Sequence, residues 1–298
     1  MIPEHLFHDL KTGNVRTLAR CISVVENDLE DSDNLLRSLI PGPVPVIGIT
    51  GPPGAGKSSL VNQLIHELVR ANKKVGVIAV DPTSPFHHGS LLGDRVRMSE
   101  HFNHPHVFIR SLATRGSLGG LSSRILEITD VMRAANFDLI LIETVGVGQS
   151  EVEIAGLADL TVLVLVPEAG DEIQQIKSGI MEIGDLFVVN KADRPGADRF
   201  VKSLYDSMRD EHRHEKRAIL KTVATQGEGI PELMEHILKV STHHENNKQT
   251  WLLTEKAWHL IQNRKMKGIR KQEIEEKIKK QKADQKVFNL YQFIEQWL

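Results

Sequence analysis

Cysteine is almost absent from this sequence, which has Cys21 as its single cysteine among 298 residues. One cysteine excludes a disulfide framework within the chain and favours a reducing compartment. Cys21 lies in a helical pattern, and a free cysteine in such a place is ordinarily a small buried apolar residue. We therefore interpret this thiol as part of the packing and not of the chemistry.

Long apolar runs and an excess of charge are absent as well. No segment approaches the roughly 20 apolar residues of a membrane span, and the acids in MIPEHLFHDL at the N-terminus do not fit a signal peptide. The net charge of −2 gives no basic footprint of the kind found on nucleic-acid-binding proteins. We expect a cytoplasmic protein with no nucleic-acid or membrane partner, although a mitochondrial matrix protein without its presequence would look the same.

The sequence does have a series of short apolar runs that alternate with helical patterns from residue 44 to about 242. The runs are rich in Val, Ile and Leu and do not alternate with polar residues, which is typical of strands buried on both faces. The alternation predicts an α/β fold with a mostly parallel central sheet flanked by helices, and ligands at the carboxyl ends of the strands. The expected strands are 44–50, 74–80, 107–112, 137–143, 160–166, 185–190 and 218–224.

Helical patterns flank this region on both sides. We expect an N-terminal helical segment at 1–43, a central domain at 44–245 and a C-terminal helical arm at 246–298. The proline-rich PGPVP at 41–45 and the polar STHHENNKQ at 241–249 mark the breaks between them.

The first expected strand runs directly into GPPGAGKSS. This stretch fits the P-loop pattern G-x-x-x-x-G-K-[ST], and the buried strand before it and the amphipathic helix after it make the match specific. The backbone N–H groups of such a loop and the start of its helix bind phosphate oxygens. We expect Lys57 to reach the terminal phosphates and Ser58 to bind Mg²⁺. The expected phosphate-binding residues are Gly51, Pro52, Pro53, Gly54, Ala55, Gly56, Lys57, Ser58 and Ser59.

The apolar run at 137–143 ends in a carboxylate, Glu143. In P-loop proteins an acid at the end of a neighbouring strand faces the magnesium ion, so we expect Glu143 to hold Mg²⁺ directly or through a water. Gly146 then fits a backbone that approaches the γ-phosphate, as in nucleotide switches. Gln149 is a weaker candidate for a catalytic role, because a residue that orients the attacking water and an ordinary surface glutamine fit this position about equally.

A second motif, VVNKAD, follows the strand expected at 185–190, and its Asn190, Lys191 and Asp193 fit the N-K-x-D pattern of guanine-binding proteins. Guanine presents two neighbouring donors to one carboxylate, whereas adenine presents an acceptor and a C–H there. A site built on such hydrogen bonds rejects the wrong base by roughly 10⁴-fold. We therefore expect GTP and GDP as the nucleotides. A backbone N–H after the next strand is expected to meet the guanine oxygen, and the candidates are Val223, Ala224 and Thr225.

Several further motifs, together with these, carry a resemblance to a known family. They are VDPTSPF, GSLLGDRVRM, RSLATRGSLGGLS, ETVGVGQSEVE and GDEIQQIKSGIMEIGDLFVVNKAD. Over essentially its whole length the chain resembles the ArgK/MeaB/MMAA family of methylmalonyl-CoA mutase-associated P-loop GTPases. The resemblance implies a chaperone of a cobalamin-dependent acyl-CoA mutase. Such a chaperone uses GTP to gate adenosylcobalamin loading and the removal of damaged cofactor, and its slow GTPase is stimulated by the partner.

The resemblance also implies roles for residues outside the two motifs. Asp81 in VDPTSPF and Asp94 in GSLLGDR match the switch carboxylates around Mg²⁺, although Asp94 also fits a helix N-cap. The expected magnesium ligands are thus Ser58, Asp81, Asp94 and Glu143. The expected catalytic residues are Lys57, Asp94, Glu143 and Gln149.

The segment GDEIQQIKSG resembles a mobile loop that couples the nucleotide state to the mutase. Its Gln174 and Lys177 are the implied coupling residues, and a solvated helix face is the ordinary alternative for Lys177. His87 and His88 stand where the family usually has small residues, and we interpret them as part of a variable solvated loop.

The C-terminal arm combines basic charge with aromatic residues. Residues 265–286 carry nine Lys/Arg and four Asp/Glu, a balance of +5, and several Glu–Lys pairs at i,i+4 spacing favour a long helix. Its aromatic residues need something to pack on, either a self-folded cap or a dimer interface. The resemblance implies a homodimer through this arm. The aromatic residues of the arm are Trp251, Trp258, Phe288, Tyr291, Phe293 and Trp297.

Two other functions compete with a GTPase switch. One is a nucleotide-dependent kinase or ATPase of an arginine/ornithine (LAO/AO) transport system, which requires a preference for ATP that the N-K-x-D motif opposes. The other is a purely structural GTP-binding subunit of a mutase complex, which requires that GTP is never turned over. The motifs favour the switch, and they leave open which acyl-CoA mutase is the client.

Overall fold

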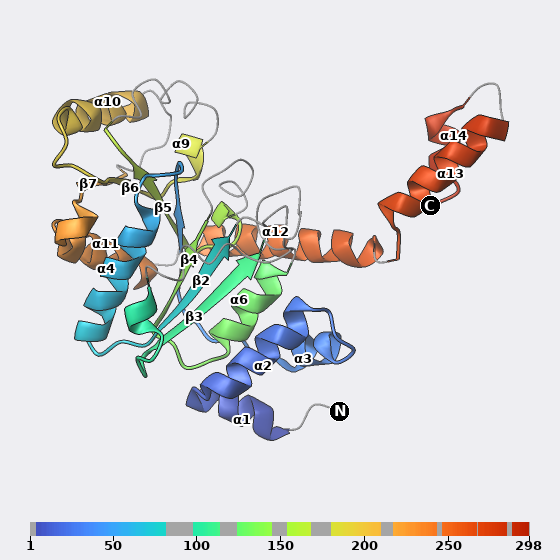
Figure 1. Ribbon diagram of the computed structural model, residues 1–298, viewed down its shortest axis with the longest axis horizontal. Helices are drawn as coiled ribbons and strands as arrows, with labels where there is room; N and C mark the ends of the chain where they lie inside the picture. The colour runs from blue at the N-terminus through green and yellow to red at the C-terminus, as the bar shows by residue number, and fades with distance from the viewer. Residues whose placement is uncertain are drawn as a thin grey trace. The chain divides into compact units, whose positions relative to one another are not determined.

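A parallel sheet forms the core of the fold (Figure 1). The computed structural model describes residues 4–81, 98–113, 124–144, 154–167, 180–209, 217–242, 246–266, 268–284 and 288–297. Within these residues the sheet has 7 strands in the order β3-β2-β4-β1-β5-β6-β7, and every neighbouring pair is parallel. The predicted α/β fold is confirmed. The strands are β1 (Val46–Thr50), β2 (Val75–Asp81), β3 (Val107–Ala113), β4 (Leu139–Glu143), β5 (Leu160–Leu165), β6 (Leu186–Val189) and β7 (Ile219–Lys221).

The strand order reverses around β1. From β1 the chain crosses to β2 and to the edge strand β3, and it then returns through β4, which lies between β2 and β1. The next strand, β5, pairs with the other side of β1. In open parallel sheets, ligands bind at the carboxyl ends of the strands where the order reverses in this way. The fold therefore places the predicted P-loop, which follows β1, at the position where a ligand is expected.

Helices cover both faces of the sheet (Figure 1). Within the described residues, no helix is at once long enough and apolar enough to cross a membrane. The helices and 3₁₀ turns before residue 140 are α1 (Glu4–Thr12), α2 (Val15–Glu26), α3 (Ser32–Ser38), α4 (Lys57–Arg70), η1 (Ser99–His101) and α6 (Ile125–Arg133). Those after it are α9 (Ile180–Ile183), α10 (Ala197–Arg209), η2 (Ala224–Gln226), α11 (Ile230–Thr242), α12 (Asn246–Lys265), α13 (Lys271–Asp284) and α14 (Leu290–Ile294).

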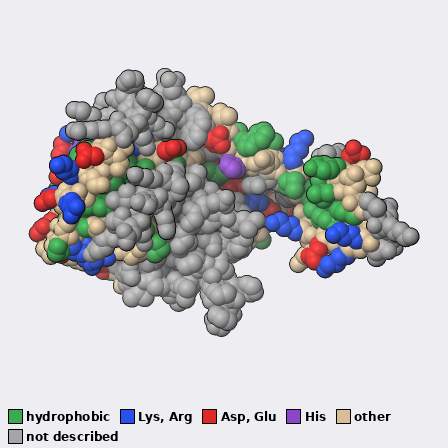
Figure 2. Space-filling model, turned by 90° about the horizontal axis from the view of Figure 1, so that it is seen from above, with side chains coloured by type: hydrophobic (Ala, Val, Ile, Leu, Met, Phe, Trp, Pro, Cys, Tyr) green, Lys and Arg blue, Asp and Glu red, His purple; other side chains and the backbone are tan. Residues whose placement is uncertain are grey.

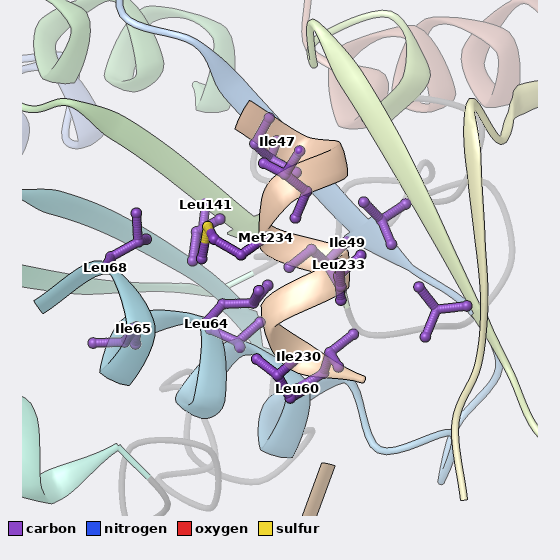
Figure 3. Packing of buried hydrophobic residues seen from close by; sticks show 14 of the residues in the cluster. Ile47, Ile49, Leu60, Leu64, Ile65, Leu68, Leu141, Ile230, Leu233 and Met234 are labelled. Atoms are coloured by element: carbon purple, nitrogen blue, oxygen red, sulfur yellow. The ribbon is translucent and has the colours of Figure 1, made fainter. Parts of the chain in front are cut away.

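Successive side chains of the central strands point into different helical layers. Ile47, Ile49 and Leu141 pack with α4 and α11, as Figure 3 shows for one cluster. Ile140 and Ile142 belong instead to the cluster that contains α2 and α6. Because both faces are covered, these strands are apolar at every position, which explains the absence of polar alternation in the sequence.

The N-terminal helices are part of this second cluster. Leu18, Ile22 and Val25 of α2 are buried with the strand residues of that face. Glu26, at the end of α2, forms an ion pair with Arg110 of β3. The segment predicted at 1–43 is therefore packed against the sheet as a covering layer.

Cys21 lies in the same layer and is 1% exposed. Burial raises the pKa of its thiol to about 11, so the thiol is protonated and unreactive at neutral pH. The interpretation of Cys21 as a packing residue is confirmed.

The chain divides into two compact units, Met1–Leu252 and Leu253–Leu298. In the smaller unit, Phe293 is buried, with its ring centroid 5.8 Å from that of Phe288 and 6.3 Å from that of Trp297. The Lys277 ammonium lies 4.1 Å from the centroid of the Trp297 ring, a distance typical of a cation–π contact. This unit therefore has a small aromatic cluster of its own. Figure 2 shows hydrophobic and basic side chains on the surface of the molecule.

Candidate functional site

The loop between β1 and α4 has a backbone that depends on glycine. Gly51 and Gly56 have φ angles of 141° and 89°, in the region that side chains other than glycine rarely adopt. A Cβ on Gly51 would lie 2.1 Å from the carbonyl oxygen of Val164, and one on Gly56 would lie 2.3 Å from Nδ2 of Asn190. The two glycines therefore let the loop approach β5 and the chain after β6 closely.

Lys57 is the first residue of α4 and is 6% exposed. Its Nζ donates hydrogen bonds to the carbonyl oxygens of Gly51 at 2.9 Å and Pro52 at 3.1 Å. The ammonium group is thereby held over the loop that the sequence predicts to bind phosphate, next to the helix N-terminus with its partial positive charge.

Ser58 and Glu143 meet although 85 residues separate them in the sequence. Glu143 ends β4, which pairs with β1, and the Ser58 hydroxyl donates to Glu143 Oε1 at 2.6 Å. The two residues are 6% and 3% exposed. A hydroxyl and a carboxylate are the hard oxygen ligands that Mg²⁺ prefers, so this donor set fits the ion that the sequence predicts here.

The remaining predicted residues around the magnesium ion and the partner loop are described only in part. The backbone of Asp81 ends β2, at the same edge of the sheet as Glu143. The other predicted residues lie outside the described residues; they are Asp94, Gly146, Gln149, Gln174, Lys177, His87 and His88.

Asn190 connects the two predicted motifs. It follows β6, is 2% exposed, and donates from Nδ2 to the carbonyl oxygen of Ala55 at 2.8 Å. Its Oδ1 accepts hydrogen bonds from the Thr222 hydroxyl and the Ala224 N–H, both at 3.1 Å. One amide side chain thus fixes the P-loop, the N-K-x-D segment and the segment after β7 relative to each other.

Lys191 adds a second link between the motifs, because its Nζ donates to the carbonyl oxygen of Gly54 at 2.8 Å. The Ala192 N–H donates to the carbonyl oxygen of Thr222 at 3.0 Å. Asp193, two residues beyond Lys191, is exposed. The carboxylate predicted to bind the base is therefore accessible, while the residues before it hold the loop in place.

The segment after β7 offers fewer free donors than its sequence indicates. The Val223 N–H donates to the carbonyl oxygen of Glu228 at 3.1 Å, and the Ala224 N–H donates to Asn190 Oδ1. Thr225 lies in η2 and is exposed. The N–H of Val223 is therefore not positioned for the predicted contact with the guanine oxygen. The N–H groups of Ala224, which would be shared with Asn190, and of Thr225 are compatible with that contact.

Thr222 is a residue of this site that the sequence analysis did not identify. It is 1% exposed and its hydroxyl orients Asn190. The available signal was a polar residue directly after an apolar strand, and it was overlooked because the N-K-x-D pattern does not include this position.

Comparisons with known proteins agree with this arrangement. Residues 18–285 match the family model described as methylmalonyl-CoA mutase-associated GTPase MeaB. A protein of Pyrococcus horikoshii that carries a GTPase name is 48% identical over 260 residues, which cover 85% of this chain and 81% of the relative. The GTPase ArgK of Escherichia coli is 36% identical over 245 residues, which cover 78% and 74% of the two chains.

A solved structure described as a LAO/AO transport system kinase has the same fold. It aligns with a TM-score of 0.69 at 24% identity and covers 100% of this chain and 98% of its own. A similarity at this level of identity establishes the fold alone. The family match spans most of the chain and includes every described residue of the site above. The chain therefore belongs to the MeaB family of GTPases.

Proposed function

We propose that this protein hydrolyses GTP as a switch that gates adenosylcobalamin loading and protection of a cobalamin-dependent acyl-CoA mutase. The mutase is of the methylmalonyl-CoA mutase type, in keeping with the family description. The observation that supports the switch best is the contact between Ser58 and Glu143. It joins the phosphate loop to the strand that leads into Gly146, so that a change at the terminal phosphate can reach the chain beyond β4.

Ser58 and Glu143 would hold Mg²⁺, with Asp81 and Asp94 as the further proposed ligands. When bound, the ion supplies positive charge to the phosphate oxygens. Lys57 exchanges its contacts with the loop carbonyls for the terminal phosphates. Water oriented by Gln149 attacks the γ-phosphorus. The bond between this phosphorus and the bridging oxygen breaks, which yields GDP and inorganic phosphate.

Guanine selection rests on Asp193, which accepts hydrogen bonds from the two donors on the base. Asn190 and Lys191 tie this carboxylate's loop to the phosphate loop. A base of the wrong kind leaves the Asp193 carboxylate facing an acceptor, which costs free energy. This preference argues against an ATP-dependent transport kinase.

The smaller unit is proposed to form a homodimer. Its surface carries several large apolar side chains in addition to the aromatic cluster, and burial of such side chains against a second copy would be favourable. These side chains are Leu253 (63% exposed), Trp258 (57%), Ile261 (54%), Met266 (56%), Leu290 (50%), Tyr291 (81%) and Ile294 (41%).

The experiment that tests the function is GTP turnover by the full chain with and without an adenosylcobalamin-dependent methylmalonyl-CoA mutase. We expect the mutase to stimulate turnover, with a factor in the roughly 5–150-fold range of allosteric couplings. Lys177→Ala should leave the basal rate nearly unchanged and reduce the stimulation, and Gln174→Ala should also reduce the stimulation. Equal stimulation of the wild type and Lys177→Ala would refute only the coupling residues. Absence of both stimulation and complex formation would refute the proposed function.

A further inference from the structure

Three side chains with metal-binding atoms lie together where η1 meets α4. They are His66 of α4 and Glu100 and His101 of η1, and their ligand atoms all lie within 4.8 Å of one another. His66 Nε2 is 3.0 Å and His101 Nε2 is 3.8 Å from Glu100 Oε1. In the described part of the chain, this is the one group of at least three His, Cys, Asp or Glu residues that meets this spacing.

We propose that His66, Glu100 and His101 form a binding site for a divalent transition-metal ion of the Zn²⁺ type. Two imidazole nitrogens and a carboxylate are a ligand set that suits Zn²⁺ and its neighbours in the first transition series. The set does not suit Mg²⁺ or Ca²⁺, which prefer oxygen ligands throughout. The site is thus chemically different from the Ser58–Glu143 pair.

The two distances from the imidazole nitrogens to the Glu100 oxygen are close to those that a bound ion requires. A tetrahedral ion with ligands at about 2.0–2.1 Å holds neighbouring ligand atoms roughly 3.3 Å apart. The contacts of 3.0 and 3.8 Å lie on either side of this value. The side chains of His66 and Glu100 are 36% and 54% exposed, so they can adjust by a few tenths of an ångström. Three protein ligands leave a fourth position for water.

His101 is the most informative member of the cluster. It is 4% exposed, and its Nε2 is buried with no hydrogen-bond partner among the described residues. A buried polar atom without a hydrogen bond costs free energy that a metal–ligand bond would offset. An ion between His101 and Glu100 would therefore give this buried nitrogen a partner.

Asn62 acts as a positioning residue for the cluster. It lies one helical turn before His66 on α4, on the same face of the helix. Its Nδ2 donates to Glu100 Oε1 at 2.8 Å, which holds the carboxylate of η1 against α4. Hydrogen bonds of this kind to ligands orient a metal site before the ion binds.

The site connects α4 with the chain that follows the predicted switch region. His66 lies about 13 Å along the helix axis from Lys57 at the usual rise per residue, so the ion would not touch the phosphates. It would instead fix η1, which follows the segment containing Asp94, to the helix of the P-loop. Its expected effect is stabilisation of this part of the fold, independent of the proposed partner.

The test is a calorimetric titration of untagged, metal-free full-length protein with ZnCl₂, complemented by the absorption spectrum of the Co²⁺ form. We expect one ion per chain and the visible bands of tetrahedral Co²⁺. His66→Ala and Glu100→Gln should each weaken Zn²⁺ binding at least about 100-fold. Mutation of residues that only orient the ligands already lowers metal affinity roughly 10–100-fold. Asn62→Ala should weaken it about 10-fold.

His8→Ala, which removes an exposed histidine of α1, is the matched control and should bind Zn²⁺ as the wild type does. GTP affinity should be unchanged in all variants, which separates loss of the metal site from loss of the fold. No saturable binding by the wild type would overturn the proposal. Wild-type Zn²⁺ affinity in both His66→Ala and Glu100→Gln would also overturn it. So would loss of Zn²⁺ binding in the double variant His87→Ala/His88→Ala and in no other variant.

Discussion

Asp193 is the single residue on which the choice of base is predicted to depend. Asp193→Asn replaces an acceptor of two hydrogen bonds by a group that offers one acceptor and one donor. Each hydrogen bond to a charged group contributes about 1.5–3 kcal/mol, so GTP affinity should fall by roughly 10²–10⁴-fold. Affinity for xanthosine triphosphate should rise, because xanthine presents a carbonyl oxygen in place of the amino group. Calorimetric titration with GTP, ATP and xanthosine triphosphate measures this change.

Asp198→Asn is the matched control for this substitution. Asp198 is an exposed acid in the first turn of helix α10 and pairs with Lys221 at 2.8 Å, and neither side chain belongs to the N-K-x-D motif. Its replacement should leave all three affinities unchanged. Equal affinity of the wild type for ATP and GTP would contradict the assignment of Asp193.

Glu143 is the residue predicted to serve the metal ion and not the base. Glu143→Ala removes a carboxylate that accepts the Ser58 hydrogen bond, and with it a ligand for Mg²⁺. GDP binding should stay measurable, while GTP turnover should fall at least about 100-fold, as for other groups that stabilise developing charge. Phosphate release under single-turnover conditions is the measurement.

Glu143→Gln separates packing from charge, since it keeps an oxygen acceptor for Ser58 at this position. Its turnover should be reduced as well, while its thermal stability should stay closer to that of the wild type. If Glu143→Ala hydrolyses GTP at the wild-type rate, the role assigned to this carboxylate is wrong.

The residues of the two nucleotide motifs could be named from the sequence because each motif is local. What the sequence did not indicate is how they connect. Asn190 was predicted as a base-binding residue, yet in the structure its side chain joins Ala55 to Thr222 and Ala224. The His66, Glu100 and His101 cluster was missed for a similar reason. His66 is far from Glu100 and His101 in the sequence, and only the packing of η1 on α4 brings the three together.

At the scale of elements, all the predicted strands exist, but some are shorter than their apolar runs. The run expected at 137–143 becomes a strand only at Leu139, after Asp138, whose carboxylate accepts the Lys74 N–H from the chain just before β2. The run at 218–224 forms a strand only to Lys221, since Thr222 and Ala224 turn towards Asn190. Burial of both sheet faces made the strands predictable, whereas side-chain contacts from other elements fixed their ends.

Helix α2 provides a prediction at this scale, because it forms part of the core. Its residue Ile22 is fully buried. Replacing a large buried aliphatic side chain by alanine costs about 2–5 kcal/mol of stability. Ile22→Ala should therefore lower the unfolding free energy of the whole nucleotide-binding unit by this amount. Urea denaturation followed by circular dichroism and by GDP affinity gives the measurement.

Val15→Ala is the control on the same helix. Val15 is 52% exposed, and surface substitutions usually change stability by less than about 0.5 kcal/mol. If Ile22→Ala left the unfolding midpoint of the unit unchanged, helices α1 to α3 would be an independent appendage and not a layer of the core.

On the scale of the whole molecule, the division into two units separates nucleotide binding from the proposed self-association. Every described residue of the nucleotide site precedes Leu253, where the smaller unit begins. The sequence indicated a C-terminal arm from its charge pattern and aromatic residues. It could not indicate which aromatic side chains pack within the arm, such as Phe293, and which remain exposed, such as Tyr291. Buried and exposed aromatic residues lie close together in the sequence there and cannot be told apart by residue type.

The dimer prediction follows from these exposed side chains. A chain that ends at Leu252 should be monomeric and should bind GTP as the full chain does, since it keeps the whole site. In the full chain, Trp258→Ala should weaken dimerisation by about 2 kcal/mol or more, because buried tryptophans are common energetic centres of interfaces. This corresponds to roughly 30-fold in the dissociation constant. Light scattering over a range of concentrations measures both variants, and a truncated chain that remained dimeric would place the interface in the larger unit.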